Sequence, residues 1–263
     1  MGAVGFMARL LVQTGLPHSR RESLSFVRTN GSLQVSISAH PLLGLPYGRY
    51  PRLLMAWVTT EAVRTKEPVL KLGPSLTAFM ADLGLLPRGG RHGPIGRLRE
   101  QMQRLFSATI AFTWDQREQG EWHDAGFRVA KETHLWWNPT QPEQTVSWCS
   151  EVHLSPGFFE AVCTKPVPVD LRVLKVLRSP MALDLYCWLT YRNSYLGKPT
   201  RVPWPALAAQ FGADYRDRKD FKRRFLRALR QVLILYPSVR VEQVRGGILL
   251  KPAPCHVQRR LEQ

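Results

Sequence analysis

The sequence predicts an α+β fold made of two structurally related domains in tandem, and three observations support that prediction. Helical and strand-like hydrophobic periodicities follow one another in the same order in each half of the chain. A shift of 128 residues places Leu83-Gly84 on Phe211-Gly212 and Leu98-Arg99 on Leu226-Arg227. Residues 138–145, with two prolines and no large apolar side chain, have the composition of a linker between the halves.

Composition and charge indicate the class of partner. The chain has 263 residues, of which 44% are hydrophobic and 22% charged, enough apolar material for a folded core and unlike a disordered chain. Its 37 Lys and Arg against 20 Asp and Glu give a formal net charge of +17. A balance this basic favours a polyanionic partner, most simply double-stranded DNA.

Targeting signals and membrane segments are not apparent in the sequence. No apolar run approaches the roughly 20 residues that a membrane-spanning helix needs. Arg9 interrupts the mildly apolar N-terminus, and no small-residue cleavage site follows it. The four cysteines are scattered, unlike those of a disulfide framework. We therefore expect a cytoplasmic protein with no membrane partner.

Residues 1–48 are expected to form an N-terminal strand and hairpin segment that packs on the first domain. Apolar and polar side chains alternate around Leu24 and Phe26, and again from Leu33 to Ile37. Between these runs, Asn30-Gly31 tolerates the positive φ angles of a tight hairpin turn.

The first domain is expected over residues 49–145. Ser75 is suited to a helix N-cap, Gly84 to a C-terminal cap and Pro94 to a first helical turn. The expected elements are a helix over about Arg52 to Lys66, a helix from Ser75 to Gly84, a helix from about Pro94, and strands over Thr109 to Trp114 and Phe127 to Trp137. On the third of these helices we expect Arg97, Gln101 and Arg104 to point away from the apolar face.

The second domain, expected over residues 146–263, repeats the order. The expected elements are helices over about Ser179 to Tyr195, Pro205 to Gly212 and Arg218 to Leu235, then strands Val239 to Val244 and Gly247 to Lys251 around a turn at Arg245-Gly246. Helix, short helix, basic helix and hairpin is the order of a winged-helix module, whose third helix enters the major groove. The sequence therefore predicts two winged-helix domains in tandem after the N-terminal β-hairpin segment.

The basic helix of the second domain carries the strongest signal for DNA binding. Residues 216–230 hold eight Lys or Arg and two Asp, a net charge of +6. At about 100° per residue, the apolar side chains share one arc of this helix and the basic side chains the other. Arginine is suited to paired contacts with guanine edges and phosphates. The predicted DNA-binding residues are Lys219, Arg223, Arg224, Arg227 and Arg230, with Arg97 and Arg104 in the first domain. An ordinary solvated helix face is the alternative for each.

Signals for catalysis and for metal binding are weak. Tyr186, Tyr191 and Tyr195 share a helix and invite comparison with the tyrosine of a nicking enzyme, but the histidines that would hold its metal are dispersed. Cys149 and His153 lie one helical turn apart, and no CxxC pair accompanies them. We therefore expect no catalytic residue, no metal and no cofactor, and so no enzyme.

A series of short segments forms a recognisable pattern over most of the chain. They are Gly5 to Arg9, Leu16 to Ser19, Gly44 to Gly48, Pro51 to Leu54, Thr59 to Thr65, Leu72 to Leu76, Ala78 to Met80, Arg97 to Met102 and Arg104 to Phe106. The pattern resembles the plasmid-encoded RepA replication initiator family.

That resemblance implies a protein that binds repeated sequences (iterons) at a plasmid origin and helps to open an adjacent AT-rich segment. It also implies work with host DnaA and the replicative helicase, repression of the protein's own promoter, and a homodimer beside the DNA-bound monomer. The N-terminus carries no leucine-zipper heptad that would form such a dimer. Two rival functions stay open. One is a winged-helix transcriptional repressor without origin-opening activity, and the other is a nicking initiator enzyme that uses one of the tyrosines.

Overall fold

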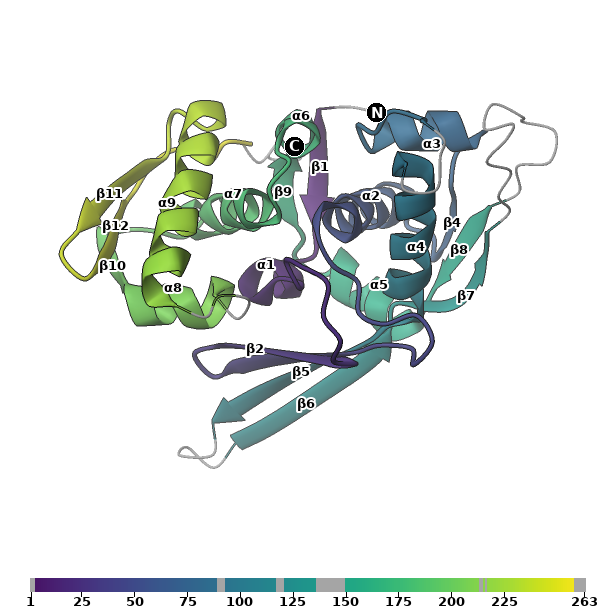
Figure 1. Ribbon diagram of the computed structural model, residues 1–263, viewed down its shortest axis with the longest axis horizontal. Coiled ribbons are helices and arrows are strands. Elements are labelled where there is room, and N and C mark those ends of the chain that lie inside the picture. The colour runs from purple at the N-terminus through teal and green to yellow at the C-terminus, as the bar shows by residue number, and fades with distance from the viewer. Residues whose placement is uncertain are drawn as a thin grey trace.

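The fold is described from a computed structural model, which covers residues 3–88, 93–116, 121–135, 150–212, 215 and 217–257. Figure 1 shows the two halves of the chain side by side, with the first half on the right and the second on the left. The predicted linker at 138–145 lies outside the described residues, as do residues 89–92 of the loop before the third predicted helix.

In the part of the first half that the structure describes, three helices after the N-terminal segment accompany a small three-stranded sheet. Its elements are α2 (Arg49–Thr65), β4 (Val69–Lys71), α3 (Leu76–Asp82), α4 (Pro94–Ser107), β7 (Ala130–His134) and β8 (Glu151–Leu154). Strand β8 lies between β4 and β7 and is antiparallel to both. Ser75 caps α3 as predicted, because its Oγ accepts a hydrogen bond of 3.1 Å from the N–H of Ala78.

The second half repeats this arrangement. Its elements are α7 (Pro180–Asn193), β10 (Thr200–Pro203), α8 (Trp204–Phe211), α9 (Arg218–Leu235), β11 (Arg240–Val244) and β12 (Gly247–Lys251). Strand β12 lies between β10 and β11, just as β8 lies between β4 and β7. The predicted hairpin is confirmed: Val244 pairs with Gly247 across a two-residue turn in which Gly246 has a φ of 83°. The repeated order of elements, predicted from the sequence, is therefore present in the topology.

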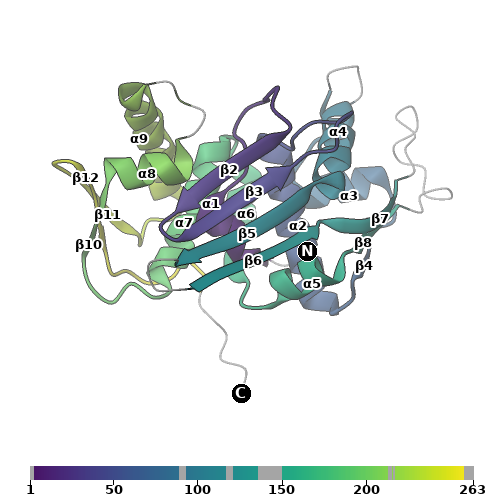
Figure 2. The same cartoon turned by 90° about the horizontal axis from the view of Figure 1, so that it is seen from below.

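A four-stranded antiparallel sheet lies along one side of the molecule and reaches both halves (Figure 2). Its order is β2 (Ser25–Asn30), β3 (Leu33–Ser38), β5 (Thr109–Gln116) and β6 (Glu121–Arg128). Strand β2 packs on α8, and β6 packs on α5 (Pro156–Cys163). The single strand predicted from Phe127 to Trp137 is wrong, because β6 ends at Arg128 and β7 begins at Ala130 in a different sheet.

The N-terminal segment joins the two halves. Strand β1 (Val4–Met7) pairs antiparallel with β9 (Val167–Asp170), and α6 (Leu171–Val176) follows β9 and packs on α2. Helix α1 (Arg9–Thr14) packs on α7 and α8. The segment expected to pack on the first domain therefore packs on the second half as well.

The predicted division of the chain after residue 145 stays a prediction. Strand β8 lies just beyond that boundary and pairs with β4 and β7, so a cut there would separate it from both partners. The core is one cluster of buried apolar side chains that extends through both halves, and α2 packs directly on α7. The two halves share an order of elements, and they also share a core.

Candidate nucleic-acid interface

The two basic helices, α4 and α9, lie on the same face of the molecule. Figure 1 views that face directly, with α9 on the left and α4 on the right. Figure 2, turned by 90°, places both helices along one edge of the molecule, so the two views agree. Each helix is the third of its half and precedes the strands that close the small sheet of that half.

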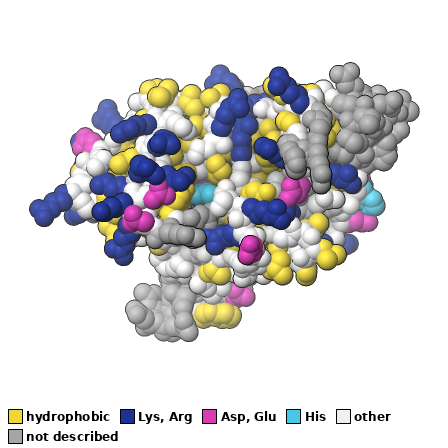
Figure 3. Space-filling model, in the orientation of Figure 1, with side chains coloured by type: hydrophobic (Ala, Val, Ile, Leu, Met, Phe, Trp, Pro, Cys, Tyr) yellow, Lys and Arg dark blue, Asp and Glu magenta, His cyan; other side chains and the backbone are white. Residues whose placement is uncertain are grey.

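Helix α9 separates its apolar and basic side chains onto opposite arcs, as predicted. The buried side chains are Phe221, Phe225, Ala228, Leu229 and Val232. The five basic side chains predicted to bind DNA are exposed, namely Lys219, Arg223, Arg224, Arg227 and Arg230, and Arg218 at the start of the helix is exposed as well. Figure 3 shows Lys and Arg side chains gathered on the left of this face, over α9 and the neighbouring hairpin. The predicted orientation of these five side chains is confirmed, whereas their contact with DNA stays a prediction.

Aromatic packing fixes α9 on the rest of the second half. Phe225 is fully buried, and its ring centroid lies 5.6 Å from that of Trp204, 5.9 Å from that of Phe211 and 5.7 Å from that of Phe221. The contacts with Trp204 and Phe211 are edge-to-face, an arrangement that is favourable beyond the area it buries. Since these rings anchor one side of the helix, the basic arc on the other side has a fixed direction.

Two aspartates organise the first turns of α9. Asp217 is the N-cap, and its carboxylate accepts a hydrogen bond of 3.0 Å from a main-chain N–H of the first turn. Asp220 contacts Arg223 Nη2 at 2.6 Å and Arg224 Nε at 2.9 Å. The hydrogen bond from Arg223 is the main cause that lowers the pKa of Asp220, and Arg224 adds to it. Asp220 is therefore ionised at neutral pH.

The hairpin beside α9 adds basic residues that the sequence analysis did not select. Arg240 and Arg245 on the hairpin and Arg201 on β10 are exposed. Arg201 Nη2 donates a hydrogen bond of 2.6 Å to the carbonyl of Arg245, which ties the turn to β10. The predicted turn at Arg245-Gly246 was the signal that could have found these residues, because it places arginine at the tip of the hairpin. The basic surface of α9 thus continues onto the hairpin.

Helix α4 presents fewer basic side chains than α9. Arg97 and Arg99 are exposed, as expected for the polar side of the helix. Gln101 and Arg104, predicted to point away from the apolar face, are buried, so the polar side of α4 is not open to solvent at these two positions, and the predicted DNA contact of Arg104 stays a prediction. The amide of Gln101 accepts a hydrogen bond of 2.8 Å from the N–H of Tyr47, which shows that a loop covers this side of the helix.

Arg104 is held by the protein itself. Its Nη1 donates a hydrogen bond of 3.1 Å to the carbonyl of Leu45, and its Nη2 forms an ion pair of 2.8 Å with Glu100. The guanidinium lies over the ring of Tyr47, 5.4 Å from the centroid. Gly44, with a φ of 78°, allows this approach, because a Cβ there would lie 2.8 Å from Arg104 Nη1. These contacts give Arg104 a structural role that the sequence analysis missed.

A buried ion pair joins the two halves behind the basic face. Arg52 of α2 contacts Asp184 of α7 through Nε at 2.7 Å and Nη2 at 2.6 Å. The imidazole of His18 bonds to the same carboxylate at 2.8 Å. Burial raises the pKa of Asp184, but the charge of Arg52 and the hydrogen bonds from His18 and Arg52 outweigh burial and hold the pKa at about 2. Burial also lowers the pKa of His18, against the effect of its bond to Asp184.

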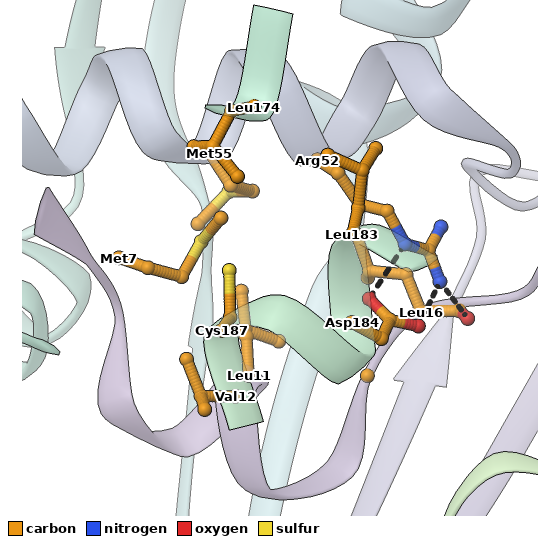
Figure 4. Close-up of a pocket in the computed structure, with 11 residues that line it drawn as sticks. Met7, Leu11, Val12, Leu16, Arg52, Met55, Leu174, Leu183, Asp184 and Cys187 are labelled. Atoms are coloured by element: carbon orange, nitrogen blue, oxygen red, sulfur yellow. Dashed lines mark hydrogen bonds and ion pairs between the residues drawn. The ribbon is translucent and has the colours of Figure 1, made fainter. Parts of the chain in front are cut away.

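Backbone carbonyls complete the shell around Arg52. Its terminal nitrogens donate to the carbonyls of Leu16 at 2.7 Å, Pro17 at 3.1 Å and Gly48 at 2.6 Å. Figure 4 shows the guanidinium beside Asp184 and Leu16. A small cavity of about 20 Å³ lies next to them. The lining around this cavity is mostly apolar, and Met7, Met55 and Cys187 point into it from three different elements (Figure 4). The pair therefore fixes the relative position of α2, α7 and the N-terminal segment.

The three tyrosines considered for a nicking reaction differ in exposure. The hydroxyl of Tyr186 is buried, accepts a hydrogen bond of 2.8 Å from the N–H of Asp170 and bonds to His256 at 2.9 Å. Burial raises the pKa of Tyr186. Tyr191 is partly buried, and Tyr195 is about half exposed.

The described residues contain neither a metal-binding group of side chains nor a membrane-spanning helix. In that part of the chain, no three His, Cys, Asp or Glu side chains are grouped so as to hold a metal ion. Cys149, one member of the weak Cys-His signal, lies outside it. Among the described helices, none is long and apolar enough to span a bilayer.

Solved structures identify the class of fold. The chain is similar to the crystal structure of a selenomethionine derivative of domains 2 and 3 of RctB, with a TM-score of 0.58 and 13% sequence identity, over 95% of this chain and 97% of that one. A second crystal structure of RctB domains 2 and 3 gives a TM-score of 0.54 and 14% identity, over 92% and 96% of the two chains. This α and β fold, with both halves present, is therefore shared with the fragment of RctB that holds its domains 2 and 3.

The sequence family narrows the class further. The sequence model for the plasmid-encoded RepA protein matches residues 45–203, more than half of the chain. The chain therefore belongs to the plasmid-encoded RepA family, as its motifs predicted. This membership supports a function as a replication initiator. No curated protein matches the chain in sequence.

Proposed function

We propose that the protein is a sequence-specific DNA-binding initiator of plasmid replication, built from two winged-helix modules. The observation that carries the proposal is the arc of five exposed basic side chains on α9, the third helix of its half. In a winged-helix module, the third helix enters the major groove and the hairpin flanks it on the DNA backbone. The exposed arginines of the β11–β12 hairpin fit that second role.

The placement of α4 beside α9 supports a single DNA duplex that crosses one face of the molecule. Both helices lie on that face (Figures 1 and 3), and both carry exposed arginine. Two modules can contact two successive major-groove segments of one duplex. Affinity would then fall steeply with salt, because each neutralised phosphate releases counterions.

Origin repeats are the proposed target, and family membership supports that choice. After binding these repeats, the protein would help to open an adjacent AT-rich segment without any bond chemistry. Unstacking such a segment costs on the order of 1 kcal/mol per base step. Protein–DNA contacts and negative supercoiling would offset that cost. On the basis of the same family we also propose that the protein works with host DnaA and the replicative helicase and that it can form a homodimer. These roles would place it in the cytoplasm.

Fluorescence anisotropy tests the DNA-binding part of the proposal. A duplex that carries a repeat from the cognate origin and a duplex of shuffled sequence are titrated with the full chain at two salt concentrations. We expect a preference of about a thousandfold for the repeat that persists at the higher salt. Equal affinities that fall together with salt would reduce the protein to a generic basic DNA binder.

Two assays separate an initiator from its rivals. Permanganate reactivity at the AT-rich segment of a supercoiled origin plasmid is expected on adding the protein, and a transcriptional repressor would leave that segment closed. Incubation of the same plasmid with the protein and Mg²⁺ tests for a nicking enzyme. Relaxed circles with protein attached to a DNA end would contradict the proposal that no bond chemistry occurs.

A further inference from the structure

The basic side chains of α9 are not equivalent, and their partners differ in kind. Arg223 and Arg224 share the carboxylate of Asp220. In the part of the chain that the structure describes, no ion pair is formed by Arg227 or Arg230. From this difference, and resting on the proposed function, we infer that Arg224 reads a base edge while Arg227 and Arg230 contact phosphates, with Asp220 as the residue that positions Arg224.

The Arg224 guanidinium is held on two sides. Its Nε donates a hydrogen bond of 2.9 Å to Asp220, and its Cζ lies 5.6 Å from the centroid of the Tyr215 ring. Tyr215 is itself packed against Phe221, at 5.8 Å between centroids, and against His18, at 6.4 Å. An arginine fixed in this way loses less conformational entropy on binding than one that is free to rotate.

The contact through Nε leaves the end of the fork available. Asp220 engages Arg224 at Nε, whereas it engages Arg223 at the terminal Nη2. A bidentate contact to the O6 and N7 atoms of guanine needs two N–H donors in one plane. Both terminal nitrogens of Arg224 can supply them while Asp220 and Tyr215 hold the plane.

The charge around Arg224 favours a base over a phosphate. A cleft of about 560 Å³ beside it is lined by Asp217 and Asp220 as well as by His18 and Tyr215. A phosphate that approached Arg224 from this cleft would meet two carboxylates. The edge of a guanine carries no net charge, so it meets a weaker repulsion than a phosphate does. No carboxylate among the described residues pairs with Arg227 or Arg230, so their charge is available to the phosphates of the DNA. They also lie further from the N-terminal part of the helix, where base contacts concentrate in helix-turn-helix proteins.

Matched lysine substitutions test the division of roles, because lysine keeps the charge and loses the planar fork. Arg224→Lys is expected to lower the ratio of affinities for repeat over shuffled duplex by about tenfold or more, the effect of losing a bidentate interaction with a base. Arg227→Lys is expected to leave that ratio unchanged, since a phosphate accepts a point charge equally well. Equal ratios for the two variants would overturn the inference.

Asp220→Ala gives a second test with effects of opposite sign. Losing the carboxylate raises the net charge by one and should tighten binding to the shuffled duplex, while losing its hold on Arg224 should weaken binding to the repeat. Glu160→Ala, which removes an exposed acid on α5, is the control for a change of net charge outside α9, and should change both affinities by the same factor. Asp220→Ala that behaves like Glu160→Ala would show that Asp220 acts only through its charge.

Two readouts keep the inference separate from the proposed function. A wild-type protein with no preference for any origin duplex would overturn both. A wild-type preference that survives Arg224→Lys and Asp220→Ala would overturn only the inference. Thermal unfolding of each variant shows whether the fold is kept. If Asp220→Ala has a much lower Tm than the wild type, Asp220→Asn, which retains an oxygen acceptor for Arg224 Nε, replaces it in the binding assays.

Discussion

Helices α4 and α9 occupy the same position in the two halves, yet they use arginine differently. On α9 five basic residues are exposed on the arc opposite the aromatic anchor, and a carboxylate contacts two of them. On α4 the loop around Leu45 covers part of the polar side and takes up Arg104 as a structural group. The same topology therefore supports one helix with an exposed basic arc and one whose polar side is partly covered by the protein. We expect the second half to dominate DNA affinity.

The largest expected effect on DNA affinity follows from removing three arginines from the basic arc of α9. Replacing Arg223, Arg224 and Arg227 together with Ala should abolish specific binding, a loss of about a thousandfold or more in affinity for the repeat. The fold should stay intact, because all three side chains are exposed. Anisotropy gives the affinity, and thermal unfolding gives the control. A drop of several kcal/mol in stability would show instead that these residues are structural.

On α4 we expect the opposite outcome, a loss of stability without a loss of DNA preference. Arg104→Met should destabilise the protein by about 2–3 kcal/mol, because the carbonyl of Leu45 loses its charged donor in a buried place. The preference for repeat over shuffled duplex should not change. Arg230→Met, on the exposed arc of α9, is the matched control and should cost less than about 0.5 kcal/mol. Urea unfolding of both variants decides, and equal stabilities would break the contrast between the two helices.

The buried ion pair between Arg52 and Asp184 fixes α2 against α7, and its contribution to the stability of the fold depends on pH. The pKa of Asp184 lies at about 2 in the folded protein, below its ordinary value of 3.8. The stabilisation is therefore complete above the ordinary value and is lost as pH falls toward 2. Its size is about 2 kcal/mol.

The comparison of wild type with Asp184→Asn isolates this effect from other carboxylates. Chemical unfolding from pH 6 downward should show a stability gap between the two proteins that narrows as the pH falls below about 4. A gap that stays constant down to pH 2 would mean that Asp184 titrates normally and that the junction does not depend on its charge.

The sequence predicted the second half more closely than the first, and the reason is physical. Helix α9 was predicted at Arg218 to Leu235, its observed bounds, because its aromatic and basic arcs are both complete within one helix. The buried state of Arg104 was not predictable in the same way. Helical periodicity shows which side of α4 faces its own core, but it carries no information on a loop from residues 44–47 that folds over the other side.

The alternation of apolar and polar residues also did not predict which distant strands pair with each other. Alternation identified both β3 and β5, but not that they would join in one sheet, because the period of a strand does not name its neighbour. Asp220 was counted only as a charge that reduced the total. Its position four residues before Arg224 on a helix was the signal that could have identified it as a partner.

The smallest expected effect sharpens the role of α4 itself. Replacing Arg97 and Arg99 with Ala should weaken binding to the repeat and to the shuffled duplex by the same factor, since these exposed side chains have no carboxylate that would hold them in a reading position among the described residues. The slope of log affinity against log salt should become shallower by about 1 for each phosphate that the variant no longer neutralises. Anisotropy at four salt concentrations measures both quantities. If the double variant instead lowered the preference for the repeat, α4 would read bases after all, and the two halves would be equal partners on the DNA. A parallel weakening with a shallower slope would assign α4 to the backbone and leave sequence reading to α9.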